Sequence, residues 1–443
     1  MSTATSLFSA HEICDWVQSQ PIDPTWSFAG YAPSQTGKWT HDYHRYPAKF
    51  IPQLVEKLLD EYISQPTAHI NDPFMGSGTT IATAISRGFM ASGTDINKIA
   101  YLISKVKARP IEPSLLEKKI RRLLSRLDGI SSDGLFYELN PLPPLVPEKH
   151  RERLAYWFPE TSILALGKIL AAIREESDAD IRDFFTVAFS HILKSCSIWL
   201  QGSNKPTRDL KKTPAEPLSA FQRHLRRMQK GNAEFYAIVP PAVRENPDAF
   251  LRLALADARH QPVEDESVDM VITSSPYVTS YEYADLHQLS TLWLDFADTL
   301  SEYRKAFIGT SCKRYENPLL KSEIAKGIVE RMAAVDKKIA KEIEAFFVDM
   351  QEVIAESYRI LKFGGRCAYV IGNTKLRGVE IQNAEVFAEQ MQLVGFKLER
   401  VIVREIPSKI LPQKRDEKTG RFASNDIADT EAYPIEYIII GAK

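Results

Sequence analysis

The segment Asn71-Asp72-Pro73-Phe74-Met75-Gly76-Ser77-Gly78-Thr79-Thr80 follows a short apolar run that begins at His69. A strand that enters a turn with two glycines, followed by small and apolar residues at helical spacing, predicts a strand–turn–helix unit over residues 69–87. Residues 89–93 read as the next strand, and Asp95 stands just after it. This alternation, with an acid after the second strand, favours a doubly wound α/β sheet.

The alternation resumes late in the chain. Apolar runs predict five further strands, over residues 251–255, 268–273, 366–371, 396–404 and 436–440. The last two are joined by a charged loop, and we expect them to close the sheet as a hairpin. Helical spacing predicts helices over 52–63, 115–127, 160–173, 180–200 and 343–361, whereas the first forty residues read as irregular.

A long stretch without strands separates the second predicted strand from the third. We therefore expect one sheet domain that is interrupted by a mainly helical insert. The predicted organisation is an N-terminal part of the sheet domain over 1–104, the insert over 105–248 and a C-terminal part over 249–443.

Composition restricts the class of protein. The 443 residues are 44% hydrophobic and carry a net charge of −1, so a nucleic-acid surface would have to be a local patch. Four scattered cysteines form no CxxC pair, which predicts neither a zinc site nor a disulfide framework. The N-terminus shows no secretory pattern, and no apolar run reaches the length of a membrane span. A cytoplasmic location is expected.

The glycine turn predicts a site for a small charged ligand. Gly76 and Gly78 leave room for close approach to the backbone, and the hydroxyls of Ser77 and Thr79 add donors. Asp95, roughly twenty residues further on, stands where a ribose diol could be held. This much suits a dinucleotide or S-adenosylmethionine equally. Asp72, at the strand end, could face a cationic amine.

A second segment, Val271-Ile272-Thr273-Ser274-Ser275-Pro276-Tyr277, predicts a loop that grips a planar amine. The exocyclic amine of a nucleobase is a poor nucleophile because its lone pair is delocalised into the ring. A catalyst must accept its hydrogens from fixed positions, and a stiff, proline-containing loop suits that task. An aromatic side chain in the same loop can stack on a base that has left the duplex.

Together these segments resemble the S-adenosylmethionine-dependent DNA amino-methyltransferases, which modify adenine N6 or cytosine N4. DPFMGSGTT at 72–80 is similar to their cofactor motif, and HRYPAKFIP at 44–52 to their additional cofactor-facing motif. The resemblance implies a Rossmann-like, seven-stranded sheet with helices on both faces. It implies cofactor contacts from Tyr46, Pro47, Ala48, Phe50, Asp72, Pro73, Phe74, Gly76, Ser77, Gly78, Thr79, Asp95 and Asp257, the last near the adenine ring.

The resemblance also assigns roles in the base loop, whose residues are Ser274, Ser275, Pro276 and Tyr277. It implies that the Ser274 hydroxyl and the Ser275 carbonyl accept the amine hydrogens and that Tyr277 stacks on the flipped base. The family pattern has two prolines, and Ser275 stands where the first is expected. Serine in the first position resembles the cytosine-N4 enzymes of restriction–modification systems, because adenine-N6 enzymes usually have Asp or Asn there.

Three alternatives stay open from the sequence. One is adenine-N6 methylation of DNA. Another is guanine-N2 methylation of tRNA, which usually goes with Asp-Pro-Pro-Tyr and a preceding RNA-binding domain. The third is a catalytically inactive DNA-binding homologue, which the departure at Ser275 permits. Carbon-5 cytosine methylation is disfavoured, because its nucleophilic Cys follows a Pro and none of the four cysteines does.

The insert is where recognition of double-stranded DNA is expected. Residues 203–232 contain eight basic residues against two acidic ones. The predicted phosphate contacts are Lys205, Arg208, Lys211, Lys212, Arg223, Arg226, Arg227 and Lys230. The resemblance further implies a prokaryotic protein that associates with the nucleoid when bound to DNA, with a cognate restriction endonuclease or defence-system protein as a partner.

Overall fold

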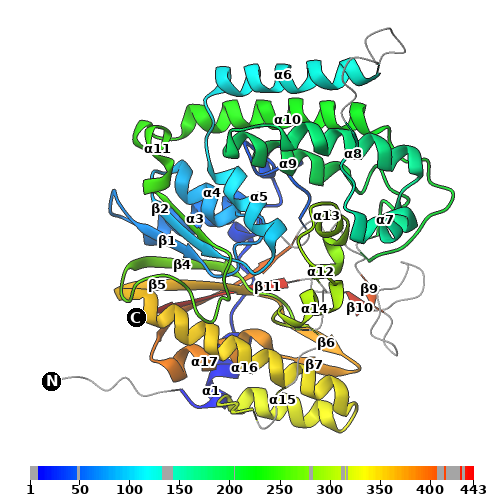
Figure 1. Cartoon of the computed structure of the whole chain (residues 1–443). Coiled ribbons are helices and arrows are strands. Elements are labelled where there is room, and N and C mark those ends of the chain that lie inside the picture. Colours follow the sequence, from blue (N-terminus) through cyan, green and yellow to red (C-terminus); the bar gives the residue numbers. More distant parts are fainter. Residues whose placement is uncertain are drawn as a thin grey trace.

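A single seven-stranded sheet, with strand order β3-β2-β1-β4-β5-β11-β8, runs through the centre of the molecule (Figure 1). The computed structural model describes residues 8–46, 50–131, 143–203, 205–278, 283–310, 315, 318–406, 414–415, 430–431 and 435–443. The strands of the sheet are β1 (His69–Asp72), β2 (Met90–Thr94), β3 (Leu251–Ala254), β4 (Val268–Ser274), β5 (Leu361–Ile371), β8 (Lys397–Glu405) and β11 (Ile435–Ala442). Two short antiparallel pairs stand apart from it: β6 (Thr374–Leu376) with β7 (Val379–Ile381), and β9 (Lys414–Arg415) with β10 (Thr430–Glu431).

The sheet confirms the seven predicted strands. Its pairs are parallel from β3 through to β5, and β11 lies antiparallel between β5 and β8. The closing hairpin of β8 and β11 is therefore present as expected. Ala91 in β2 pairs with Leu251 in β3, so two strands on either side of the insert are neighbours. This pairing keeps the sheet continuous across the interruption.

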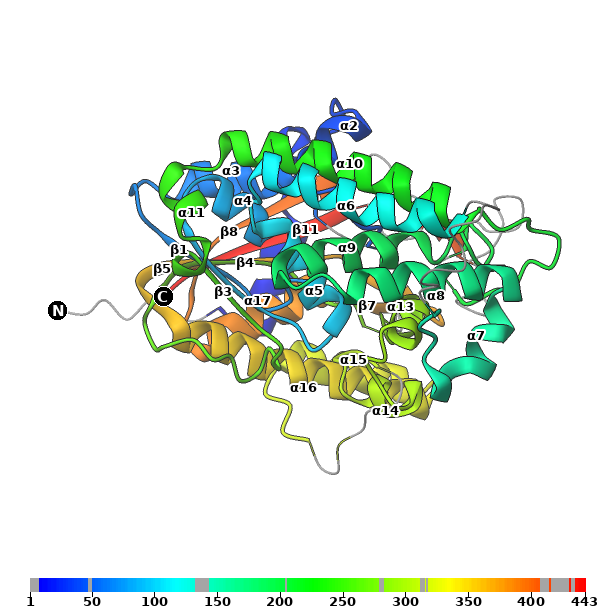
Figure 2. The ribbon, with the colours of Figure 1, turned by 45° about the horizontal axis from the view of Figure 1, so that its top comes forward.

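Helices cover both faces of the sheet (Figures 1 and 2). The helices before the insert are α1 (Ala10–Gln18), α2 (Pro33–Thr36), α3 (Pro52–Tyr62), α4 (Thr79–Ser86) and α5 (Lys98–Ala108), with η1 (Pro24–Trp26). Those that follow β4 are α12 (Tyr283–Leu286), α13 (Gln288–Trp293), α14 (Leu300–Lys305), α15 (Glu323–Ala333), α16 (Lys337–Ile360) and α17 (Asn383–Val394). One core joins α3 and α4 to the sheet, and a second joins α1, α15, α16 and α17 to its other face.

The predicted insert is helical in the part that the structure describes. Its helices are α6 (Pro113–Ser131), α7 (Arg151–Trp157), α8 (Glu160–Arg174), α9 (Ala179–Ile192), α10 (Pro217–Ile238) and α11 (Pro241–Glu245), with η2 (Glu148–His150) and η3 (Pro247–Ala249). Helices α6 to α10 share a core with residues of α5 and α13, whereas Val243 of α11 belongs to the core of α3 and α4. Among the described residues, no helix is both long enough and apolar enough to cross a membrane.

Two sequence predictions about helices were wrong in position or extent, and one long helix had not been predicted. The first forty residues contain α1, whose N-cap Ser9 and residue Glu12 form a capping box. The helix predicted over 180–200 ends at Ile192, where the hydroxyl of Ser195 donates to the Ile192 carbonyl at 2.7 Å. The basic stretch contains the long helix α10, which begins with Pro217 after the N-cap Glu216.

Candidate functional site

The two motifs meet at one edge of the sheet. Strands β1 and β4 are parallel neighbours, with Ile70 opposite Met270 and Asn71 opposite Val271. The glycine turn leaves the carboxyl end of β1, and the base loop leaves the carboxyl end of β4. Ligand sites in open α/β sheets lie at this edge. The segments predicted to hold cofactor and base are therefore adjacent, although about two hundred residues separate them in the chain.

Asp72 connects the two strand ends. It is 3% exposed, and its Oδ1 accepts hydrogen bonds from the Thr273 hydroxyl at 2.7 Å and from the Phe74 backbone N–H at 3.1 Å. Burial raises the pKa of Asp72 to about 6, against the lowering effect of these hydrogen bonds. A carboxylate in this position favours a cationic ligand, because ionisation of a buried acid is easier beside a positive charge.

The two glycines of the turn provide space, and their backbone N–H groups are already paired within the protein. Gly76 has a φ of +48°, and a Cβ there would lie 3.2 Å from the Tyr46 ring. Its N–H donates to Asp95 Oδ2 at 3.0 Å, so this predicted ligand donor is already paired. Gly78 has a φ of +71°, and a Cβ there would lie 2.8 Å from the Ser104 Cα. Both positions require glycine, Gly76 next to the pocket and Gly78 where α4 packs closely on α5.

Asp95 closes the turn from the neighbouring strand. Its carboxylate accepts the Gly76 N–H and, at 2.8 Å, the Asn97 N–H. Burial raises the pKa of Asp95 to about 7, and the nearby charge of Asp72 contributes to this rise. Two acids with raised pKa values in one cleft are typical of a functional site. Each carboxylate oxygen has a second lone pair, so Asp95 can also accept from a ligand hydroxyl.

The base loop is anchored at both ends. Ser274 is half-buried and lines the same pocket as Asp72. Ser275, which replaces the expected proline, is 3% exposed, and its hydroxyl lies 3.4 Å from the Val370 carbonyl of β5. The Tyr277 hydroxyl donates to Glu436 of β11 at 2.9 Å. This bond anchors the hydroxyl end of an aromatic ring that lines the pocket, where the ring can serve as a stacking surface.

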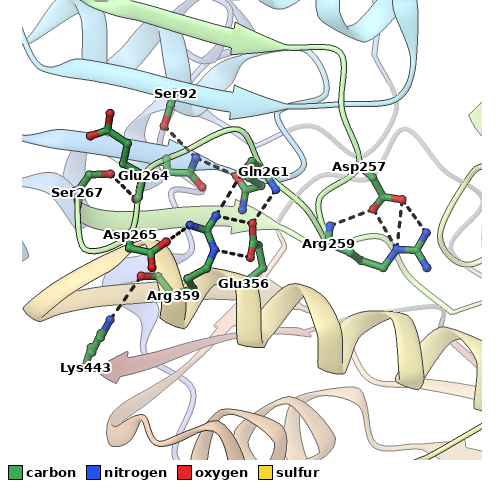
Figure 3. Close-up of polar contacts among 11 residues, drawn as sticks. Ser92, Asp257, Arg259, Gln261, Glu264, Asp265, Ser267, Glu356, Arg359 and Lys443 are labelled. Atoms are coloured by element: carbon green, nitrogen blue, oxygen red, sulfur yellow. Dashed lines mark hydrogen bonds and ion pairs between the residues drawn. The ribbon is translucent and has the colours of Figure 1, made fainter.

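The acid after the third strand, Asp257, completes the site. It is bound by the guanidinium of Arg259, with Nη2 to Oδ2 at 2.6 Å and Nε to Oδ1 at 3.0 Å (Figure 3). The carboxylate therefore has a fixed orientation. Because β3 lies two strands away from β1, Asp257 reaches the pocket from a different side than Asp72 does.

These segments enclose a pocket with about 930 Å³ of empty volume, part of which opens to solvent. Most predicted site residues line it: Tyr46, Phe50, Asp72, Pro73, Phe74, Gly76, Ser77, Thr79, Asp95, Asp257, Ser274, Ser275, Pro276 and Tyr277. Gly78 does not line the pocket. It lies instead where α4 packs closely on α5. Pro47 and Ala48 lie outside the described residues.

Sequence reasoning missed part of the pocket wall. Ile96 follows Asp95, and Ala256 and Ala258 flank Asp257. Because they are adjacent in sequence to predicted site residues, they could have been predicted as well. Residues 306–308 also line the pocket, but no motif marks them. They reach it only because the chain after the base loop folds back through α12, α13 and α14.

None of the eight predicted DNA contacts lines the pocket, and they divide into two groups. Lys205, Arg208, Lys211 and Lys212 belong to the loop between α9 and α10, whereas the other four lie on α10. Lys212 donates to the carbonyls of Lys194 at 2.8 Å and Trp199 at 2.7 Å, so it holds the loop together.

The cations on α10 are partly engaged. Arg227 forms an ion pair with Asp42, and Lys230 lies 3.8 Å from Glu234. Arg223 and Arg226 are exposed. The structure thus separates a loop group from a helix group, a distinction that the sequence did not show.

Comparisons with known proteins match this chain to one class. Residues 14–105 match the family model for DNA methylase of the N6/N4 type. The chain is 26% identical to Type II methyltransferase M.MvaI of Kocuria varians, over 93% of this chain and 94% of that protein. It is 21% identical to Type II methyltransferase M.AvaI of Nostoc sp., over 82% of this chain and 80% of that protein. Over 96 residues, 22% of this chain and 18% of its relative, it is 36% identical to Type II methyltransferase M.MjaII of Methanocaldococcus jannaschii.

Proposed function

We propose that this chain, a DNA amino-methyltransferase that uses S-adenosylmethionine, transfers the methyl group to the exocyclic N4 of a flipped-out cytosine at a specific DNA site. The family resemblance and the cofactor are confirmed by the DNA methylase match and by relatives that align along most of the chain. The choice of cytosine N4, and membership of a Type II restriction–modification pair, are our proposals.

The observation that carries the proposal is the shared pocket of the glycine turn and the base loop. When bound, the cofactor supplies an electrophilic methyl group. Asp72 suits its cationic amine, Asp95 its ribose hydroxyls and Asp257 its adenine edge. The fit is supported by Gly76, where a Cβ would crowd the Tyr46 ring that forms the opposite wall.

The base loop can activate an amine without a covalent intermediate. The Ser274 hydroxyl and the Ser275 carbonyl are the proposed acceptors of the two amine hydrogens, which draws the nitrogen toward tetrahedral geometry. Tyr277, held through its hydroxyl by Glu436, is the proposed stacking surface. Serine in place of a carboxylate or amide at residue 274 supports cytosine as the target, by resemblance to the N4 enzymes.

For DNA contact we propose the loop between α9 and α10 rather than α10 itself. Arg208 stacks on the exposed ring of Tyr156 in α7 at 4.1 Å. Arg153 of the same helix also lies over this ring, at 4.8 Å, and its Nη2 is 3.5 Å from Gln288 Oε1 of α13. Gln288 follows His287, whose ring lies 4.9 Å from that of the pocket residue Tyr46, so Arg153 contacts an element that borders the pocket.

The orientation of α10 supports the same assignment. Its C-terminal end leads through α11 and η3 into the start of β3, at the amino edge of the sheet. At that edge Pro240 contacts Gly88, which precedes β2. The C-terminal end of α10 therefore lies away from the pocket edge, whereas its N-terminal half contacts Tyr43 through His224 (Figure 1). We also propose that residues 105–248 act as the target-recognition part of the molecule.

Nucleoside analysis tests the proposal. The purified protein is incubated with methyl-labelled S-adenosylmethionine and DNA of mixed sequence, and the digested product is separated by mass spectrometry. We expect label in N4-methylcytosine. Label in N6-methyladenine would show that adenine, and not cytosine, is the target base of a DNA amino-methyltransferase. DNA without label would contradict the proposed methyl transfer. Ser274→Ala serves as the control for contaminating activity. The cytoplasmic location and the partner endonuclease stay predictions.

A further inference from the structure

Two arginine–carboxylate networks lie side by side along α16 (Figure 3). Arg359 is bound to Glu356 at 2.7 Å, to Asp265 and to the Gln261 carbonyl at 3.2 Å. None of these residues lines the pocket. The second network, around Arg259, ends at a pocket residue, Asp257. Both networks consist of an arginine bound to carboxylates. Of the two, only the Arg259 network includes a residue that lines the pocket.

Arg259 is held from both sides. Toward the pocket, its Nε and Nη2 form a two-pronged contact with the Asp257 carboxylate, and its backbone N–H adds a bond to Oδ1 at 2.9 Å. Away from the pocket, its Nη1 donates to Asp349 Oδ1 at 2.8 Å and to the Tyr315 hydroxyl at 2.9 Å. Asp349 is 1% exposed, so this rear anchor is part of the core.

Such a bracket restricts Asp257 more than a surface ion pair would. A lone aspartate after a strand can rotate about two side-chain torsions, whereas the fork fixes the plane of the carboxylate. Oδ1 already accepts from both Nε and the Arg259 backbone N–H, so Oδ2 is the oxygen of this carboxylate that can accept from a ligand. The paired acids also raise the pKa of Arg259 above its ordinary value, first through the Asp257 hydrogen bonds.

We propose that Arg259 is a positioning residue for the adenine ring of the cofactor, because it aims the Asp257 carboxylate at the exocyclic amine of that ring. This inference rests on the cofactor seat proposed above. Arg259 itself does not line the pocket, so its effect passes through Asp257. A fixed carboxylate accepts a hydrogen from a 6-amino group and repels a 6-oxo group, which makes it a filter for adenine over hypoxanthine.

The test measures binding without catalysis. S-Adenosylhomocysteine and its hypoxanthine counterpart, S-inosylhomocysteine, are titrated into the full-length protein by calorimetry in the absence of DNA. We expect the wild type to prefer the adenine compound by about tenfold or more, the effect of a hydrogen bond to a charged group. Arg259→Met should bring this ratio close to one. Arg359→Met, which removes the neighbouring network, should leave the ratio unchanged.

Two further variants separate positioning from general loss of structure. Arg259→Lys keeps the charge beside Asp349 but lacks the fork, and we expect a reduced ratio in a protein that still unfolds cooperatively. The single variant Asp257→Ala and the double variant with Arg259→Met should show the same ratio of affinities for the adenine and hypoxanthine compounds. This is expected because Arg259 acts through Asp257.

Equal loss of affinity for both compounds in Arg259→Met, with the ratio unchanged, would mean that Arg259 only supports the fold. A wild type without preference would overturn the role of Asp257 as well. Neither result depends on which base is methylated, so both are distinguishable from failure of the proposed reaction.

Discussion

Asp72 and Asp95 are the residues on which the chemistry of the cofactor seat depends most. Their pKa values rise to about 6 and about 7, in both cases first because of burial. The sign of the stability effect follows from this direction. A raised folded-state pKa gives stability that is present below the ordinary pKa of about 3.8 and is lost as the pH rises toward 6–7. At neutral pH the two buried acids therefore destabilise the ligand-free protein, because they carry negative charge. A bound cationic ligand offsets this cost.

We predict that cofactor affinity rises with pH between 5.5 and 8, in the range of those two pKa values. Below about pH 6 both acids are protonated, and binding must first remove their protons. Calorimetry in buffers of different ionisation enthalpy should show proton release on binding near pH 6.5, with a smaller release in Asp95→Asn. An affinity independent of pH would show that neither acid titrates with binding.

The neighbouring serines of the base loop offer a matched pair. Ser274 faces the pocket, whereas the buried hydroxyl of Ser275 lies near the Val370 carbonyl. We predict that Ser274→Ala lowers the turnover number by about 100-fold, because it removes a proposed acceptor. Ser275→Ala should lower it by less than about tenfold, since its backbone carbonyl remains. Single-turnover methylation and cofactor titration measure both, and cofactor affinity should hold in each. Equal losses in the two variants would contradict the assigned roles.

At the scale of elements, the carboxyl edge of the sheet could be predicted from the sequence. Strands β1 and β4 each lead into a polar motif, and parallel neighbours bring those ends together. The register that joins Thr273 to Asp72 was not predictable, because it depends on which strands become neighbours. The same holds for Gly76, whose N–H is paired with Asp95 across β1 and β2.

Other elements were missed for identifiable reasons. In α10, Phe221, Leu225 and Met228 are buried at helical spacing, but the surrounding cations and prolines obscured this pattern, and no helix was predicted. Serine hydroxyls end α9 early, an effect that periodicity does not register. Residues 306–308 reach the pocket wall only through the tertiary fold, and no motif in the sequence around them predicts this position.

The division of basic residues between loop and helix leads to a prediction about DNA binding. Replacing Lys205, Arg208 and Lys211 by Met should weaken binding and make the salt dependence shallower by about two to three units of slope. Replacing Arg226, Arg227 and Lys230 should change the slope less, because Arg227 pairs with Asp42 and Lys230 lies near Glu234. Fluorescence anisotropy with duplex DNA at several salt concentrations measures both slopes. Lys118→Met, on the outer helix α6, is the control for loss of an exposed lysine. The reverse ranking would identify α10 as the DNA face.

At the scale of the whole molecule, the insert is joined to the pocket by buried histidines. His224 of α10 stacks on His191 of α9 with ring centroids 3.6 Å apart. His191 lies edge-on to His44 at 5.6 Å, and His287 lies 4.9 Å from the pocket residue Tyr46. The insert, the N-terminal segment and the helices after the base loop therefore share one polar interior, although they are far apart in the sequence.

This interior should make the fold sensitive to acid. Burial first, then the charge of His287, lowers the pKa of His44 to about 3, and burial lowers that of His224 to about 4, with Arg45 contributing. A lowered folded-state pKa gives stability that is full above the ordinary value of about 6.5 and is lost as the pH falls toward 3–4. Asp72 and Asp95 act in the opposite direction over part of this range, so wild type and variant must be compared at each pH.

We predict that His224→Gln is destabilised at pH 7 by the loss of the stacked ring, and that its deficit shrinks as the pH falls from 6.5 to 4.5. The deficit should shrink by up to about 1.4 kcal/mol per pH unit, because the variant has no imidazole to protonate on unfolding. Urea unfolding followed by tryptophan fluorescence gives the free energies. His11→Gln, at an exposed position on α1, should follow the wild type throughout. A deficit that stays constant with pH would mean that His224 contributes by packing alone and that its protonation is not linked to unfolding.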